Sequence, residues 1–152
     1  MKHKSSGKVL DLGCGSGGLS LDLAKKGFDV TCVDISKTAI KRIKEEAKKR
    51  EIEINAVCVD LENYKIKEDY DIILILGILH FIEEKAEILL EKVKKHTKKG
   101  GINIIDAFRN QHLPKDRLEE IYKSWKLKEK EEYIWKSDDF AKMIYLIMEK
   151  SK

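Results

Sequence analysis

Cysteine is scarce in this sequence, and its three copies are poorly spaced for a disulfide framework or a metal site. Cys14, Cys32 and Cys58 are odd in number and form no C-x-x-C pair. Cys32 and Cys58 fall within expected buried strands, where cysteine acts as a small apolar side chain. We therefore expect neither a disulfide framework nor a bound metal.

Long hydrophobic runs are also missing. The longest one, residues 72–82, contains Gly77 and His80 and is too short to span a bilayer. No signal peptide is visible at the start of the chain. These absences predict a cytoplasmic location and no membrane partner.

Charge is abundant but balanced in sign. Charged residues make up 38% of the chain, and the formal net charge is only +4. Lysine and glutamate alternate along the expected helices, which is typical of solvated helix faces rather than of a nucleic-acid surface. Proline, asparagine and glutamine are scarce and isoleucine is abundant, a balance that resembles thermophile proteins. A length of 152 residues predicts a single domain, residues 1–152.

A glycine-rich turn follows the first expected strand. Residues 8–12 are mainly apolar, glycines crowd residues 13–18, and apolar residues recur at helical spacing over residues 16–26. Such a turn lets the backbone approach a ligand closely. The free N–H groups at the start of the helix favour polar or anionic ligand groups.

The turn fits two known patterns. Gly13, Gly15 and Gly18 match the dinucleotide fingerprint G-x-G-x-x-G. With Asp11 in front, Gly13, Gly15 and Gly17 also match D-x-G-x-G-x-G, which resembles motif I of the class I S-adenosylmethionine (SAM)-dependent methyltransferases. That resemblance implies that Asp11 anchors the turn and reaches the amino end of methionine. Near a dinucleotide pyrophosphate the same carboxylate would be repelled, and capping of the turn alone is the other alternative.

The rest of the chain alternates expected strands with expected helices. The strands are residues 8–12, 29–34, 54–60, 70–76, 102–108, 127–135 and 142–150, and the helices are residues 16–26, 36–50, 83–98 and 115–125. The last two strands have only a short connection, which makes them antiparallel. This order predicts an α/β fold, an open, mainly parallel seven-stranded sheet with helices on both faces and an antiparallel edge.

Acidic residues end the second and third strands. Ligands of such sheets bind beyond the carboxyl ends of the strands, where the strand order reverses. Asp34 can accept hydrogen bonds there from both ribose hydroxyls of an adenosine ligand, whether NAD or SAM. The alternatives are that Asp34 caps the helix beginning at Ser36, and that Asp60 is a solvated loop acid.

Five segments together resemble the class I methyltransferase core in order and spacing. They are residues 9–20, 30–35, 57–61, 70–76 and 100–105. The resemblance implies a Rossmann-like methyltransferase fold, with the last strand inserted between strands five and six, and SAM as cofactor. It also implies that Asp60 accepts from the adenine amino group and that Leu61 helps to hold the ring. The cofactor-binding residues expected on these grounds are Asp11, Gly13, Cys14, Gly15, Gly17, Asp34, Ile35, Asp60, Leu61 and Leu76.

Within this class, the chain is similar to the tellurite-resistance (TehB-like) methyltransferases. The matching pieces are residues 27–34 (GFDVTCVD), 70–74 (YDIIL) and 122–125 (YKSW). Two departures leave the acceptor open. Only eight residues precede Val9, where the family usually has helices that fold over SAM. Either the site is open, or a homodimer partner or another subunit covers it, or the chain is a shortened product. Residues 136–141 replace a longer, histidine-bearing segment.

Candidates for the acceptor side follow the fourth and fifth strands. They are Gly77, His80, Phe81, Phe108, Arg109 and His112. Soft nucleophiles such as thiols or metalloid oxyanions need little help from a base, whereas a hydroxyl or ammonium group needs one. His80 is the candidate catalytic base, with a structural histidine as the alternative. Arg109 either holds an anionic substrate or is a solvated loop residue.

Three functions remain open from the sequence. The first is a SAM-dependent methyltransferase acting on a small molecule or a metalloid; nucleic-acid nitrogens are disfavoured because no D/N-P-P-Y/F motif follows the fourth strand. The second is a SAM-binding subunit that methylates RNA or protein only with a partner. The third, an NAD-dependent oxidoreductase, is disfavoured by Asp11, by the antiparallel ending and by the lack of a second domain.

Overall fold

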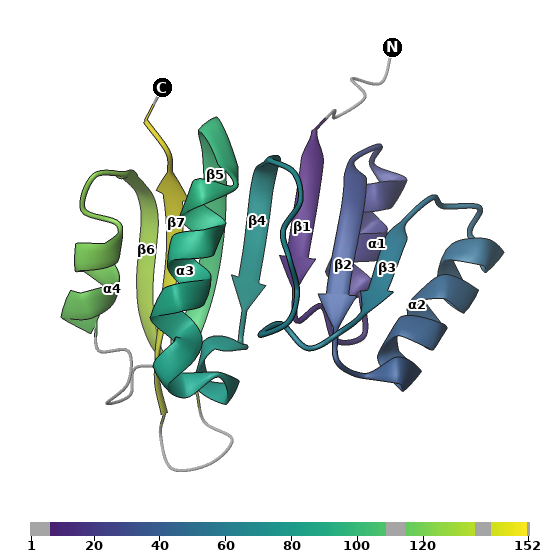
Figure 1. The fold of residues 1–152 in the computed structure, drawn as a ribbon, viewed down its shortest axis with the longest axis horizontal. Helices are drawn as coiled ribbons and strands as arrows, with labels where there is room; N and C mark the ends of the chain where they lie inside the picture. Colours follow the sequence, from purple (N-terminus) through teal and green to yellow (C-terminus); the bar gives the residue numbers. More distant parts are fainter. Residues whose placement is uncertain (1–6, 109–114, 136–140, 152) are drawn as a thin grey trace.

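A twisted seven-stranded sheet forms the centre of the computed structural model, which describes residues 7–108, 115–135 and 141–151 (Figure 1). The strands are β1 (Lys8–Leu12), β2 (Asp29–Asp34), β3 (Asn55–Cys58), β4 (Tyr70–Leu76), β5 (Thr97–Phe108), β6 (Lys126–Trp135) and β7 (Ala141–Glu149). Their spatial order is β3-β2-β1-β4-β5-β7-β6. The first five strands are parallel, and β7 runs antiparallel to both β5 and β6. The predicted sheet, its antiparallel edge and the inserted last strand are confirmed.

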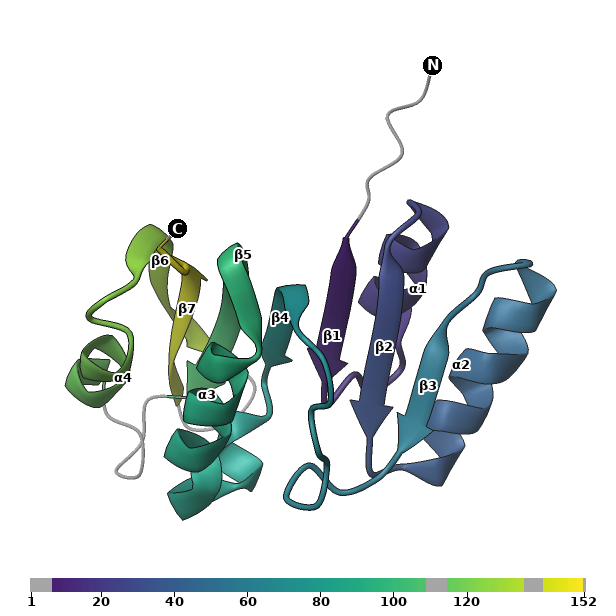
Figure 2. The same ribbon diagram turned by 45° about the horizontal axis from the view of Figure 1, so that its top comes forward.

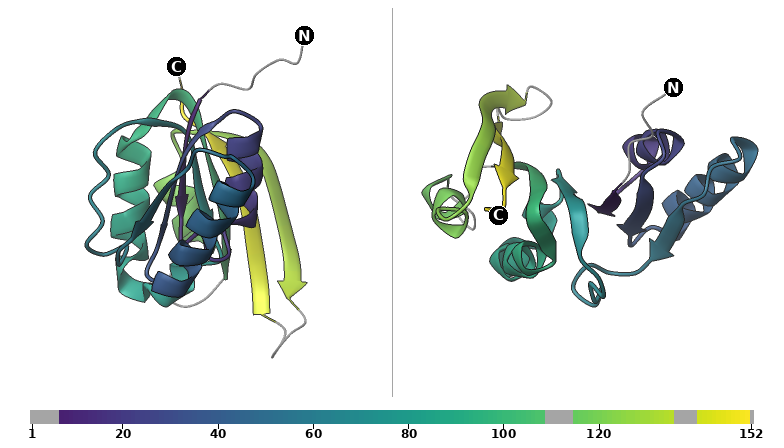
Figure 3. Two further views of the ribbon diagram at one scale, coloured as in Figure 1. Left: turned by 90° about the vertical axis from the view of Figure 1, so that its right-hand side faces the viewer. Right: turned by 90° about the horizontal axis from the view of Figure 1, so that it is seen from above.

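Helices cover the two faces of the sheet in pairs. They are α1 (Gly18–Lys25), α2 (Lys37–Lys49), α3 (Ala86–Lys95) and α4 (Lys115–Ile121). Along β1, Leu10 and Leu12 pack with residues of α3 and α4, whereas Val9 faces the side of α1. This alternation follows from the two-residue period of a strand. Figure 3 shows the two pairs on opposite sides, and Figure 2 shows the sheet between them.

The core beneath α3 and α4 contains one buried polar network. Asn103 of β5 is fully buried and accepts a hydrogen bond from the Thr97 hydroxyl at 2.8 Å. Its amide nitrogen donates to the Tyr122 hydroxyl, also at 2.8 Å. Burial raises the pKa of Tyr122, so this phenol stays protonated. The network ties the end of α4 to the middle of the sheet.

Several elements begin or end at other residues than predicted. α1 starts at Gly18 instead of residue 16, because Gly17 has a left-handed φ of +73°. α3 starts at Ala86 instead of residue 83, because two 3₁₀ turns, Leu79–Phe81 and Glu83–Lys85, come first. β5 starts at Thr97 instead of residue 102. The strand runs on through Gly100, which has a φ of +74°, and the pairing of β5 with β4 shifts register there, between Tyr70 and Ile72. In the ranges that the structure describes, every helix is too short or too polar to cross a membrane.

Candidate functional site

The glycine-rich turn between β1 and α1 bends over the end of β2. The N–H groups of Gly13 and Cys14 both donate to the Val33 carbonyl, at 2.8 and 3.1 Å. Gly13, Gly15 and Gly17 all have positive φ angles, +74°, +53° and +73°. Such angles are strained for any residue with a side chain. The turn is therefore fixed against the sheet by backbone contacts that these glycines permit.

The three glycines of the turn differ in what a side chain would meet. A Cβ on Gly13 would lie 2.1 Å from Ile78, and one on Gly17 would lie 2.4 Å from Ile43 of α2. A Cβ on Gly15 would meet no protein atom within 4 Å. Gly17 thus serves the packing of α2, whereas Gly15 faces open space.

The space beside Gly15 is a cavity of about 510 Å³ at the carboxyl ends of β1 to β4. Its lining residues are Gly13, Gly15, Asp34, Ile35, Asp60, Leu61, Glu62, Leu76, Gly77, Ile78, Phe81 and Ile82. Here β1 lies between β2 and β4, so the chain moves outward in both directions and the strand order reverses. Ligands of open α/β sheets bind at such a point.

Asp34 connects the glycine turn to the start of α2. One carboxylate oxygen accepts the Gly15 N–H at 2.9 Å, and the other accepts the Ser36 N–H at 2.8 Å. The helix itself is capped by the Ser36 hydroxyl, which accepts from Ala39. Because each carboxylate oxygen can accept more than one hydrogen bond, Asp34 keeps acceptor capacity toward the cavity.

Asp60 and Ile35 border the same end of the cavity. Asp60 Oδ1 accepts the Glu62 N–H at 2.9 Å, and its carbonyl accepts from Tyr64 at 3.0 Å, which fixes a compact turn after β3. Ile35 is 67% exposed and Phe81, across the cavity, is 76% exposed. Large apolar side chains exposed at a cavity mouth are typical of surfaces that hold an apolar part of a ligand or partner.

Asp11, Cys14 and Gly17 are not among the residues that line the cavity. Asp11 is buried beneath the turn, where its carboxylate accepts the Ser20 hydroxyl of α1 at 2.6 Å. Burial raises the pKa of this carboxyl, although the hydrogen bond from Ser20 opposes the effect. Asp11 therefore joins β1 to α1 under the turn. Direct cofactor contact by these three residues stays a prediction.

Of the acceptor-side candidates, Gly77 and Phe81 line the cavity. Gly77 has a φ of +65°, and its N–H donates to the Asp106 carbonyl at 2.8 Å. His80 does not line the cavity. The centroid of its ring lies 3.9 Å from the centroid of the Phe81 ring, and burial lowers the pKa of His80. Phe108 is the last residue of β5, and Arg109 and His112 lie outside the described residues.

Several residues at or near the site were not predicted. Glu62, Ile78 and Ile82 line the cavity; Glu62 could have been found because it follows Asp60 and Leu61 directly. Asp106 of β5 pairs in register with Leu76 and accepts the Tyr133 hydroxyl at 2.8 and 2.9 Å.

Burial, with the hydrogen bond and charge of Asp106, raises the pKa of Tyr133 to about 12. No sequence pattern predicts the contact between Tyr133 and Asp106, because it depends on the register in which β7 pairs with β5 and with β6.

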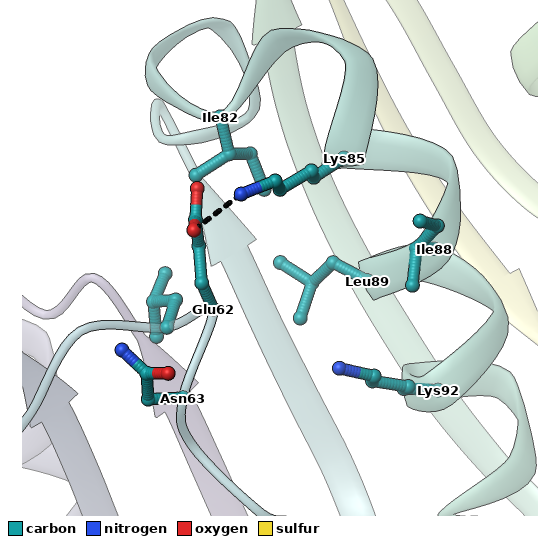
Figure 4. A pocket seen from close by; sticks show the side chains of 8 residues that line it. Glu62, Asn63, Ile82, Lys85, Ile88, Leu89 and Lys92 are labelled. Atoms are coloured by element: carbon teal, nitrogen blue, oxygen red, sulfur yellow. Dashed lines mark hydrogen bonds and ion pairs between the residues drawn. The ribbon is translucent and has the colours of Figure 1, made fainter.

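A second cavity of about 370 Å³ lies beside the first and shares Leu61, Glu62 and Ile82 with it. Figure 4 shows Lys85 reaching across to Glu62, with which it forms an ion pair at the boundary. The pair joins the turn after β3 to the segment that leads into α3.

Sequence comparisons show which family the chain belongs to. The family model described as tellurite resistance protein TehB matches residues 1–143. A probable S-adenosyl-L-methionine-dependent methyltransferase TehB of Haemophilus influenzae is 33% identical over 134 residues, which cover 80% of this chain and 47% of that protein. A ubiquinone biosynthesis O-methyltransferase of Rickettsia typhi is 32% identical over 100 residues, 66% of this chain and 40% of the relative. The chain thus spans about half the length of the curated relatives it matches.

Solved structures agree with the sequence comparisons. The crystal structure of TehB from Haemophilus influenzae superposes with a TM-score of 0.87 at 28% identity, covering 97% of this chain and 58% of that one. The N-methyltransferase NodS of Bradyrhizobium japonicum, in complex with S-adenosyl-L-homocysteine (SAH), gives a TM-score of 0.79 at 17% identity, with 95% and 78% covered. The latter likeness shows the Rossmann-like methyltransferase fold alone. The predicted family resemblance is confirmed, and the chain belongs to the TehB family.

Proposed function

We propose that this chain binds SAM in the cavity beside Gly15 and transfers the methyl group of SAM to an acceptor. The observation that carries the proposal is the bridge from Asp34 to the Gly15 N–H at 2.9 Å. It places a carboxylate with free acceptor capacity at the edge of a turn with no side chain in the way. Membership of a family with relatives named SAM-dependent methyltransferases supports the same assignment.

The residues around the cavity fit the parts of SAM. Asp34 is suited to the two ribose hydroxyls. Ile35 and Leu61 supply apolar surface for the adenine ring, and Asp60 offers an acceptor for its amino group. The open space at Gly15 accommodates the chain that joins ribose to methionine, because a Cβ there would meet nothing of the protein itself.

The role of the protein in the reaction is to position the acceptor against the methyl group and to exclude water. SAM, when bound, supplies an electrophilic methyl group on a sulfonium sulfur. Leu76 and Gly77, at the end of β4, form the wall nearest β5 and the acceptor side. Phe81 adds an apolar surface there that displaces water. Holding the nucleophile in line accounts for much of the rate enhancement of such transfers.

For the acceptor, we propose a small molecule or a metalloid oxyanion. The description of the family, tellurite resistance, supports the metalloid. A soft nucleophile would need little help from a base, whereas a hydroxyl or ammonium acceptor would require one, and His80 is the candidate for that role. Methyl transfer from labelled SAM to tellurite, selenite, a small thiol, a catechol and a primary amine, with His80→Ala compared for each, separates these cases, because only the last two acceptors should depend on His80.

A covering partner is the second part of the proposal. Ile35 and Phe81 are both mostly exposed at the mouth of the cavity, and a second copy or another subunit would cover them. Light scattering of the protein with and without SAH tests for a dimer. A monomer that methylates an acceptor by itself would contradict the requirement for a partner.

Titration calorimetry with SAM, SAH and NAD tests the cofactor assignment. We expect binding of SAM and SAH and none of NAD. Asp34→Ala should lower the affinity for SAH by more than tenfold, because one lost charge-assisted hydrogen bond costs about 1.5–3 kcal/mol. Asp29→Ala is the matched control, since it removes a 70% exposed carboxylate from the other end of the same strand. Equal SAH affinity in the two variants would refute the role of Asp34.

A further inference from the structure

The positive charge of this protein is concentrated on one helix. α2 carries six lysine or arginine residues and two glutamates, which gives it a net charge of +4. The formal net charge of the whole chain is also +4, so the charges of all other residues together cancel. Figure 1 shows α2 as the outermost helix on the β3 side of the sheet. A negatively charged partner would therefore be attracted chiefly to this helix.

Four of these cations form a lysine row along one side of α2. They are spaced by four, three and four residues, which places them in one narrow strip of a helix with about 3.6 residues per turn. All four are exposed, and they are Lys37, Lys41, Lys44 and Lys48. The helix thus presents a line of ammonium groups to solvent.

Few acidic groups neutralise the lysine row. Within the described part of the chain, Lys41 alone among the four has an ion pair, with Glu45 at 3.8 Å, and the other three have neither an ion pair nor a hydrogen bond. Glu46 lies on the opposite side of α2, where it pairs with Arg50 at 2.7 Å, and Arg50 reaches Asp22 of α1 at 3.9 Å. Like charges three or four residues apart repel one another along a helix. A bound polyanion would remove this repulsion.

We propose that the lysine row binds the phosphate backbone of a nucleic-acid duplex, independently of base sequence. From Lys37 to Lys48 the helix rises by about 16 Å. Each strand of a duplex carries one phosphate about every 3.4 Å along its axis, so several phosphates come within reach of the four ammonium groups. α2 has no aromatic side chain on which a base could stack. The contacts would therefore be made to phosphates, which carry no sequence information.

The surroundings of α2 favour a nucleic acid over an anionic membrane. A helix that lies on a membrane inserts an apolar face between the lipids. The apolar face of α2 is already used, because Ile40, Ile43 and Ala47 are buried against the sheet. Only charge is left on the exposed side, and charge alone suffices for sequence-independent binding to nucleic acid.

The lysine row begins beside the cavity and leads away from it. Lys37 follows Asp34 and Ile35, which line the cavity at the proposed ribose end. Gly77, at the acceptor side, belongs to the opposite wall, at the end of β4. The row is therefore suited to hold a duplex against the protein and not to deliver the methyl acceptor. Binding at the row does not require SAM, so it can be tested separately from the proposed function.

Fluorescence anisotropy of short labelled duplexes of DNA and of RNA, titrated with the full chain at several salt concentrations, tests the proposal. Contacts with four phosphates predict that log K falls against log salt with a slope of about −3.6. The double variant Lys44→Gln with Lys48→Gln should reduce the size of this slope by about 2 and weaken binding at low salt at least tenfold.

The matched control is Lys92→Gln with Lys95→Gln on α3. These two lysines are also exposed and one helical turn apart, and the control lowers the net charge by the same amount. Its affinity for the duplexes should stay within about twofold of the wild type, because both lysines lie outside the row. Both double variants should melt close to the wild type, because the substitutions are confined to exposed side chains.

The possible results separate the row from its alternatives. No binding of either duplex at low salt would overturn the proposal. Equal weakening by the two double variants would also overturn it, because the attraction would then come from the overall charge. Binding to phosphatidylserine vesicles without binding to a duplex would assign the row to a membrane instead. If the wild type binds no SAH in calorimetry, the proposed function fails while the anisotropy still decides the role of the row.

Discussion

Gly15 and Gly17 allow a direct test of the division of labour within the turn. Both have left-handed backbone angles, so the same change to alanine introduces a comparable backbone strain of about 1–2 kcal/mol at each position. They differ in their surroundings, since a Cβ on Gly17 meets Ile43 at 2.4 and 2.6 Å and a Cβ on Gly15 meets nothing.

The expected losses of stability follow from these surroundings. In Gly17→Ala, Ile43 must move by roughly 1 Å, and overpacking of this kind costs about 1–3 kcal/mol on top of the strain. The total of about 2–5 kcal/mol corresponds to a fall in melting temperature of roughly 10 °C for a chain of this size. In Gly15→Ala the strain acts alone, and the melting temperature should fall by roughly 2–8 °C.

The affinity for SAH should fall more in Gly15→Ala than in Gly17→Ala, the reverse of the order expected for stability. Gly15→Ala should lower SAH affinity more than tenfold, and a leucine at Gly15 should abolish it, because the new side chain enters the cavity. Gly17→Ala should keep its SAH affinity below its lowered melting temperature. Thermal denaturation and calorimetry on the two variants supply both readouts. Normal SAH binding by the Gly15 variants would mean that the ligand lies elsewhere.

Two further predictions concern buried polar groups. Burial raises the pKa of Asp11 in the folded protein, so the folded state holds a proton more tightly than the unfolded state, and stability falls as the pH rises from about 4 through that raised pKa. Asp11→Asn does not titrate, so its melting temperature relative to the wild type should increase with pH; a constant difference would show that Asp11 does not cause the dependence. Tyr122→Phe leaves the amide of the buried Asn103 without its acceptor and should cost about 1–3 kcal/mol in chemical denaturation, whereas an unchanged midpoint would show that the amide finds another partner.

The topology of the sheet could be predicted because local signals and the global fold agree. The strand expected over residues 70–76 matches β4 at both ends. The expected end of β2 at Asp34 is also confirmed, which places this residue at the cavity. These features depend on patterns within a few residues, which a single sequence contains.

Features that depend on packing between elements could not be predicted. The pattern D-x-G-x-G-x-G does not distinguish Gly15, which faces the cavity, from Gly17, which faces Ile43 of α2. The start of α3 was predicted three residues too early, because Glu83–Lys85 form a 3₁₀ turn and the α-helix begins only at Ala86. The contact of Tyr133 with Asp106 requires the register of β6 and β7.

The place of β7 has a consequence for biosynthesis. β7 follows β6 in the chain but lies between β5 and β6, and β6 pairs only with β7 among the described strands. A nascent chain on the ribosome therefore cannot complete this side of the sheet until residues 141–149 have emerged from the exit tunnel. Until then β5 presents an unpaired edge, which is prone to pair with other chains. Chaperone binding to stalled chains should thus persist until the last strand is released.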